Sequence, residues 1–149
     1  MADRPDRWAR HRTRVALVQA VFQWLFAAPT SHELESQFAM EGKLDKVDRE
    51  FFRAALRGIL HGREALDAKL APCLDREVAE LGRLEHAVLL LGCYELEHML
   101  ETPYRVVISE AVGIAKDYGA AESHRFVNAV LDKLADQLRP TETAASRAS

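Results

Sequence analysis

Apolar side chains recur every three or four residues along nearly the whole chain, which is the spacing of one face of an α-helix. No segment shows the alternation that is typical of a strand. The sequence therefore predicts an all-α bundle of about seven helical segments. The expected segments cover about residues 9–28, a short helix between Thr30 and Gly42, and then about 45–70, 74–81, 84–100, 103–119 and 122–138.

The residues that punctuate these segments are typical helix ends. Thr30 and Glu33 have the spacing of a capping box, in which each side chain binds the other residue's backbone N–H. Pro72 and Gly82 interrupt the apolar pattern, and we expect Pro140 to end the last helix. The tail over residues 141–149 is small and polar and is predicted to be disordered.

Length and composition are those of one globular domain, here residues 1–140. The chain has 149 residues, of which 48% are hydrophobic and 29% charged, enough to bury a core without metals or disulfides. Cys73 and Cys93 are isolated, as is typical of a reducing compartment. No apolar run has the length of a membrane span, and the start lacks a secretory signal. We therefore expect a cytoplasmic protein.

The net charge of −3 is unevenly distributed, which changes this plain picture. A basic segment over residues 4–14 carries five arginines, among which Arg7, Arg10 and Arg14 share one face if the start is helical, while Arg12 points elsewhere. Guanidinium groups bind phosphate in a fork and stay charged. The segment predicts a polyanion partner, although a solvated terminus has the same composition.

Two further stretches carry candidate binding chemistry. Residues 123–128 place a cation, an aromatic ring and an amide near a helix start, the parts that bind single-stranded RNA, unless Phe126 is a core residue. Residues 75–101 hold seven acidic side chains against two arginines, which suits a basic protein partner but is also typical of a solvated helix face.

Catalytic and metal-binding patterns are missing from the sequence. Glu95 and His98 form one Glu-x-x-His pair, whereas a carboxylate-bridged di-iron site needs two such pairs and further glutamates. A solvated helix face is the better interpretation of that pair. The sequence has no H-E-x-x-H, G-x-S-x-G or phosphate-binding glycine loop. We expect no catalytic residue, metal or cofactor.

Three blocks of the chain share one further feature. They are Arg10–Arg14 followed by Ala16–Trp24, then Leu81–Leu96, then Pro103–Gly119 followed by Ser123–Lys133. All three resemble the NusB family of bacterial transcription antitermination factors. The resemblance spans about residues 10–140. It implies two helical sub-bundles, about residues 9–81 and 82–139. It also implies binding of boxA RNA together with NusE, a small-subunit ribosomal protein, in a complex with other Nus factors and RNA polymerase that reads through terminators.

The resemblance also assigns roles to individual positions. Combined with the charge pattern, it predicts an RNA-binding set made of Arg7, Arg10, His11, Arg12, Arg14, Phe22, Glu122, Ser123, Arg125 and Phe126. It places Glu80 and Glu85 on the side that faces the protein partner. An alternative is a stand-alone RNA-recognition module related to the NusB-like domain of ribosomal RNA methyltransferases. The sequence does not distinguish a monomer from a homodimer.

Overall fold

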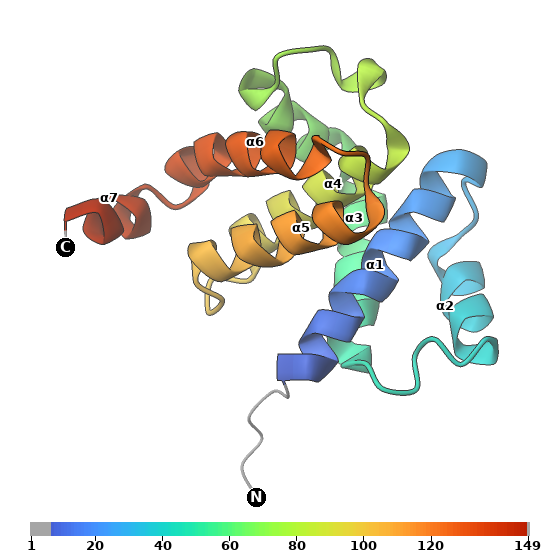
Figure 1. Ribbon diagram of the computed structural model, residues 1–149. Coiled ribbons are helices and arrows are strands. Elements are labelled where there is room, and N and C mark those ends of the chain that lie inside the picture. The colour runs from blue at the N-terminus through green and yellow to red at the C-terminus, as the bar shows by residue number, and fades with distance from the viewer. Residues whose placement is uncertain (1–6, 149) are drawn as a thin grey trace, which may run out of the picture.

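The computed structural model describes residues 7–148 as helices joined by short loops (Figure 1). No strand occurs within that range, so the predicted all-α fold class is confirmed. The start of the predicted basic segment, residues 4–6, lies outside the described residues. The α-helices are α1 (Arg7–Ala27), α2 (Ser31–Met40), α3 (Arg49–Leu70), α4 (Arg83–His98), α5 (Tyr104–Tyr118), α6 (Ser123–Leu138) and α7 (Pro140–Ala148).

Side-chain caps fix where α2 and α3 begin. Thr30 Oγ1 accepts from Glu33 N at 3.0 Å, and the Glu33 carboxylate accepts from Thr30 N at 2.8 Å, which confirms the predicted capping box. Asp48 Oδ1 accepts from Phe51 N at 3.1 Å, so α3 begins at Arg49 rather than at residue 45. The loop before it keeps the polar side chains of residues 41–48 at the surface.

Helix α4 occupies the centre of the fold and packs against α1, α3, α5 and α6 (Figure 1). Its residues from His86 to Cys93 are all buried, because a helix that is apolar nearly all round must be surrounded by other helices. The core is one continuous cluster that runs through both halves of the chain. The division into sub-bundles near Gly82 stays a prediction, since α4 lies just after that point and contacts both halves.

The segment over residues 74–81 is not the two-turn helix that the sequence predicts. Single 3₁₀ turns form instead over Ala71–Cys73 and Val78–Glu80. Pro72 lacks an N–H for a longer helix, and Glu77 and Glu80 cap the second turn, with Glu77 N donating to Glu80 Oε1 at 2.8 Å. Polar side chains satisfy the backbone here without a complete α-helical turn.

The tail is also ordered where the sequence predicts disorder. Pro140 begins α7 instead of simply ending α6, because a proline fits the first turn of a helix, where its missing N–H is not needed. The Glu142 carboxylate accepts from Tyr104 N at 2.8 Å, and Arg105 Nε donates to Ser146 Oγ at 2.8 Å. These hydrogen bonds to α5 hold α7 in place. The composition of the tail, which is small and polar, does not reveal that such partners exist.

Two glycines inside helices, the buried Gly92 and the half-buried Gly113, are expected to respond in opposite ways to replacement by alanine. A Cβ at Gly92 would lie 2.9 Å from both Cδ atoms of buried Leu131, whereas a Cβ at Gly113 would have no atom within 4 Å. We expect Gly92→Ala to lower the free energy of unfolding by about 1–3 kcal/mol through overpacking. Gly113→Ala should raise it by about 0.5–1 kcal/mol through helix propensity. Denaturant unfolding of both variants checks the pair, and equal effects would contradict the packing explanation.

Candidate nucleic-acid interface

The described part of the basic segment forms the exposed start of α1. Trp8 is 63% exposed, Arg7 is exposed and Arg10 is half-buried. Arg10 Nε is buried and has no hydrogen-bond partner among residues 7–148. An arginine cluster beside an exposed indole ring can attract phosphates and stack on a base.

Arg12 connects this end of α1 to the loop before α3. Its Nε donates to the carbonyl oxygen of Lys46 at 2.8 Å, and Thr13 Oγ1 accepts from Asp48 N at 2.8 Å. Lys43 lines the same surface cavity as Arg12. Sequence reasoning missed both lysines, because the approach of residues 43–48 to α1 depends on these tertiary contacts. We call Arg7, Arg10, Arg12, Lys43 and Lys46 the basic end.

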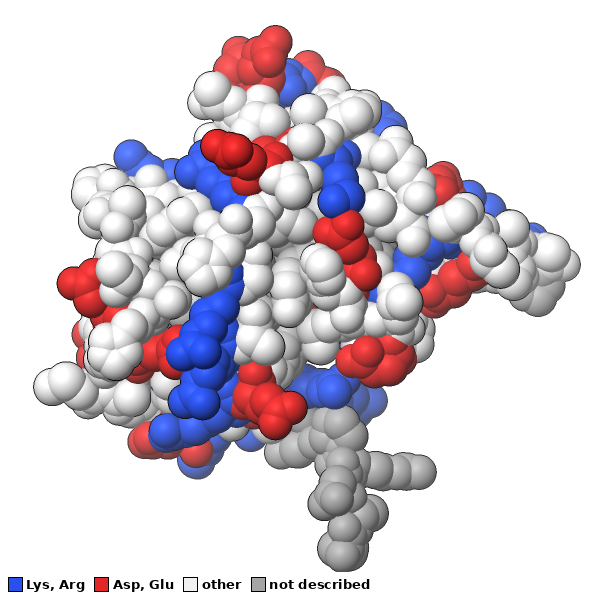
Figure 2. Space-filling view, turned by 180° about the vertical axis from the view of Figure 1, so that it is seen from behind, with Lys and Arg blue, Asp and Glu red and all other residues white. Residues whose placement is uncertain are grey.

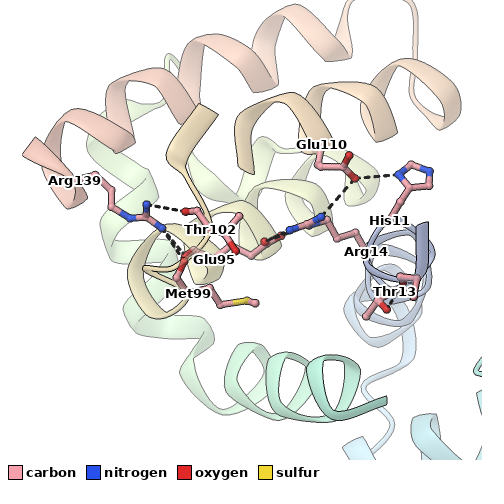
Figure 3. Close-up of polar contacts among 9 residues, drawn as sticks. His11, Thr13, Arg14, Glu95, Met99, Thr102, Glu110 and Arg139 are labelled. Atoms are coloured by element: carbon pink, nitrogen blue, oxygen red, sulfur yellow. Dashed lines mark hydrogen bonds and ion pairs between the residues drawn. The ribbon is translucent and has the colours of Figure 1, made fainter. Parts of the chain in front are cut away.

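The structure corrects the assignment of Arg14 to phosphate binding. This side chain is buried, with the residue 4% exposed, and it lies inside the helix bundle (Figure 3). Its Nε donates to Glu95 Oε2 at 2.9 Å and its Nη2 to Glu95 Oε1 at 2.8 Å. Burial lowers the pKa of Arg14, but the hydrogen bonds and charge of Glu95 outweigh it and raise the pKa overall. Arg14 is thus a structural cation with a dedicated partner.

The interpretation of Glu95 and His98 as one solvated face is wrong for Glu95. Glu95 is 1% exposed, and burial raises the pKa of its carboxyl group despite the bonds from Arg14. His98 remains exposed on the same helix. A buried carboxylate needs a paired cation, and the sequence gives no local sign of it because Arg14 and Glu95 are far apart along the chain.

His11 faces α5 rather than open solvent. Its Nδ1 lies 2.9 Å from Glu110 Oε1, and the same oxygen lies 3.7 Å from Arg14 Nη1 (Figure 3). Glu110 therefore links the surface ring to the buried pair Arg14–Glu95. A role of His11 in RNA binding stays a prediction, with Glu110 as the competitor for its ring nitrogen.

The predicted residues at the start of α6 lie together, and Glu85 of α4 is among them. Ser123 Oγ donates to Glu85 Oε2 at 2.9 Å, and Arg125 Nε lies 3.4 Å from Glu122 Oε1 at the surface. The guanidinium of Arg76 lies over the half-buried ring of Phe126, 4.2 Å from the ring centroid. Ser123 itself is buried, whereas Glu122 and Arg125 are exposed and Phe126 and Glu85 are half-buried at the same place.

An apolar groove runs along α1 toward α4 and α5. Its cavity of about 490 Å³ is lined mainly by apolar side chains. Phe22 is 40% exposed there, beside Phe26 at 69% and Tyr118 at 58%. Sequence reasoning singled out Phe22 but missed the other two rings, whose positions give no signal beyond being aromatic at a helix surface. The remaining lining includes Val15, Val18, Gln19, Gln23, Leu84 and Ile114.

Groups suited to catalysis are sparse in the described part of the chain. No cluster of three or more His, Cys, Asp or Glu side chains there could hold a metal ion. Burial raises the pKa of Cys93 to about 12, which keeps this thiol protonated. None of the helices between residues 7 and 148 combines the length and apolar character needed to cross a bilayer.

Known proteins match this chain over nearly its whole length. A sequence model of the NusB family matches residues 11–136. The transcription antitermination protein NusB of Aromatoleum aromaticum is 48% identical over 139 residues, which cover 93% of this chain and 96% of that protein. The same protein from a species of Azoarcus is 48% identical over 144 residues, or 96% of this chain and 93% of the relative.

Solved structures agree with the sequence match. Thermotoga maritima NusB superposes with a TM-score of 0.76 at 32% identity, covering 86% of this chain and 91% of that one. A chain from a complex of the antitermination factors NusB and NusE with double-stranded RNA has a TM-score of 0.79 over 89% of this chain and 99% of that one. At 22% identity the second match shows the fold alone. Family model, relatives and architecture together establish that this chain belongs to the NusB family.

Proposed function

We propose that this protein is a transcription antitermination factor that holds nascent RNA and a basic protein partner on adjoining surfaces. The observation that carries the proposal is the separation of two kinds of surface. The basic end lies at the start of α1, while the apolar groove lies farther along α1 and ends at Leu84 of α4, next to Glu85. A protein with one polyanionic and one basic partner needs this separation.

The basic end is the surface best suited to the RNA backbone. Arg7, Arg10 and Arg12 come from one helix start, and Lys43 and Lys46 come from the neighbouring loop. Each phosphate that such cations neutralise releases counterions, which is the main source of affinity for nucleic acid. The RNA expected from the family resemblance is the boxA element.

The start of α6 is a second proposed RNA contact, separate from the basic end and next to the partner-facing Glu85. The side chain of Arg125 is 77% exposed, and its ion pair with Glu122 is of the solvent-exposed kind that contributes little to stability. Its charge therefore remains available for a phosphate, and Arg76, which lies over the half-buried Phe126 ring, adds a second cation beside it. Ser123 positions this helix start through its bond to Glu85.

The apolar groove suits a protein better than RNA. Phe22, predicted as an RNA contact, lies here among apolar side chains rather than at the basic end. Exposed aromatic rings in an apolar groove fit apolar side chains of a protein. We therefore propose that Phe22, Glu80 and Glu85 face a NusE-type partner, in line with the assembly of NusB with NusE in the structurally similar complex.

In this proposal the protein catalyses no reaction and acts by assembly with other Nus factors and RNA polymerase. The alternative, an RNA-recognition module related to that of ribosomal RNA methyltransferases, would bind RNA without NusE. The apolar groove favours the first function, because binding of an RNA backbone needs cations and makes no use of a cavity lined by apolar side chains.

Binding of boxA RNA with and without purified NusE tests the proposal. We expect the protein to prefer boxA over a scrambled RNA, and NusE to strengthen this binding about tenfold, a common size for the coupling between two ligands. Fluorescence anisotropy gives both affinities, and size-exclusion chromatography shows the complex. Equal affinities for boxA and the scrambled RNA would overturn the proposal. A boxA affinity that NusE does not change would favour the alternative.

A further inference from the structure

Three arginines form a row on the outer face of α3, apart from every residue that the sequence predicted for binding. Arg49, Arg53 and Arg57 recur every four residues, so they lie about 6 Å apart along the helix axis. Their side chains are 57%, 60% and 52% exposed. Figure 2 shows a column of Lys and Arg side chains over α3 on the face seen from behind. We call these three residues the α3 arginine row.

Acidic neighbours neutralise this row only in part. Arg53 Nε and Arg57 Nε lie 3.1 and 3.3 Å from the two carboxylate oxygens of one residue, Glu35. Arg49 Nη2 lies 3.8 Å from Asp45 Oδ1. The terminal Nη groups of Arg53 and Arg57 donate no hydrogen bond within residues 7–148. Three guanidinium groups thus share two carboxylates and keep donors directed to solvent.

The row continues the basic end. Lys46 is exposed just before α3, and its carbonyl oxygen binds Arg12 of α1. Cations therefore follow one another from Arg12 through Lys46 and along α3. Arg10 lies apart from this run, in a cavity that it lines together with Asp48, Glu50 and Glu101.

We propose that the α3 arginine row binds the backbone of RNA that flanks the boxA element; the inference rests on the proposed function. Regularly spaced cations along one line match the repeat of phosphates in an extended strand. None of the large apolar side chains exposed in the described chain lies on α3. A protein interface needs an apolar centre, whereas backbone binding needs only cations, so RNA is the occupant that this surface fits.

Two RNAs and a set of matched variants test the row. One RNA contains boxA alone, and the other is extended at either end by a run of uridines. Arg53→Gln/Arg57→Gln removes two cations, Arg53→Lys/Arg57→Lys keeps the charge, and Glu35→Gln removes the shared acid. Lys116→Gln/Lys133→Gln removes two exposed cations from α5 and α6 as a control. Affinities are measured over a range of salt, and circular dichroism verifies folding.

We expect Arg53→Gln/Arg57→Gln to bind the extended RNA about tenfold more weakly at low salt, with a salt slope smaller by about 1.4. Its affinity for the short RNA should stay unchanged. The lysine variant and the control should resemble the native protein, and Glu35→Gln should bind the extended RNA a few-fold more tightly. Opposite effects of removing the cations and their acid cannot come from loss of folding.

The outcomes separate this inference from the function on which it rests. Failure of the native protein to prefer boxA overturns the proposed function itself. Full boxA preference combined with unchanged binding of the extended RNA by Arg53→Gln/Arg57→Gln overturns the row alone. If Arg53→Gln/Arg57→Gln no longer binds NusE but still binds the extended RNA with native affinity, the inference is also overturned, because the α3 arginine row is then a contact for the protein partner.

Discussion

Arg14→Ala is expected to lower the free energy of unfolding by about 3–5 kcal/mol, the usual cost of leaving one partner of a buried ion pair alone. The Arg14 guanidinium makes three hydrogen bonds to the two carboxylate oxygens of Glu95 in a site closed to solvent. Removing it leaves a carboxylate with no cation to offset its burial. Denaturant unfolding at neutral pH measures the loss.

The pH dependence of this variant identifies the unpaired carboxyl group. Burial already raises the pKa of Glu95 in the native protein, and loss of Arg14 raises it further. The folded variant then binds a proton that the unfolded chain releases, so its stability falls as the pH rises through the range between the two pKa values. We expect the difference between variant and native protein to be larger at neutral pH than in mild acid.

A double variant gives the control for the ion pair. Arg14→Met/Glu95→Leu replaces both charges by apolar groups, and such replacements of buried pairs are often neutral or stabilising. We expect the free energy of unfolding of this double variant to be close to that of the native protein and well above that of Arg14→Ala. If both variants lost the same stability, packing around Arg14, including its contact with the Phe51 ring, would be the cause instead.

Arginine spacing in the first helix explains why the sequence could indicate a basic surface but not its members. A helical repeat places Arg7, Arg10 and Arg14 on one face and Arg12 on another. In the structure that face turns into the bundle, so exposure falls from Arg7 through Arg10 to Arg14. Arg12, which the repeat sets apart, stays at the basic end. Which helix face meets α4 and α5 is decided by tertiary packing, which a single-helix pattern does not contain.

The helices themselves were largely predictable, because their apolar repeats and caps are local. Thr30 and Glu33 cap α2, and because they are only three residues apart, the T-x-x-E pattern of the sequence shows both partners. The errors fall where long-range polar contacts decide the backbone. Glu142 and Ser146 hold α7 against α5, and Lys46 joins the basic end through the bond of its carbonyl oxygen to Arg12. Neither contact leaves a periodic trace in the sequence.

Because Arg14 is buried while Arg7, Arg10 and Arg12 reach the surface, we expect Arg14 to affect the stability of the fold and the other three to affect RNA affinity. Arg7→Gln/Arg10→Gln/Arg12→Gln removes three cations from the basic end. We expect boxA binding to weaken by about thirtyfold to a hundredfold near about 0.1 M salt, with a salt slope smaller by about two. The free energy of unfolding should fall by about 1–2 kcal/mol, because the exposed Arg7 contributes little to folding while the triple variant also loses the bond from Arg12 to Lys46 O. This loss is smaller than that of Arg14→Ala.

The buried-pair variant is the matched control for this loss of binding. Arg14→Met/Glu95→Leu removes an arginine from the same motif but none from the surface, so it should bind boxA RNA with the native affinity and salt slope. Anisotropy titrations at several salt concentrations compare the two variants with the native protein. RNA binding that fell with the loss of Arg14 in a folded protein, or survived the loss of Arg7, Arg10 and Arg12, would show that the phosphates lie elsewhere. Both variants alter the start of α1. A loss of RNA binding that occurs only in Arg7→Gln/Arg10→Gln/Arg12→Gln is therefore explained by contacts between the basic end and the RNA backbone.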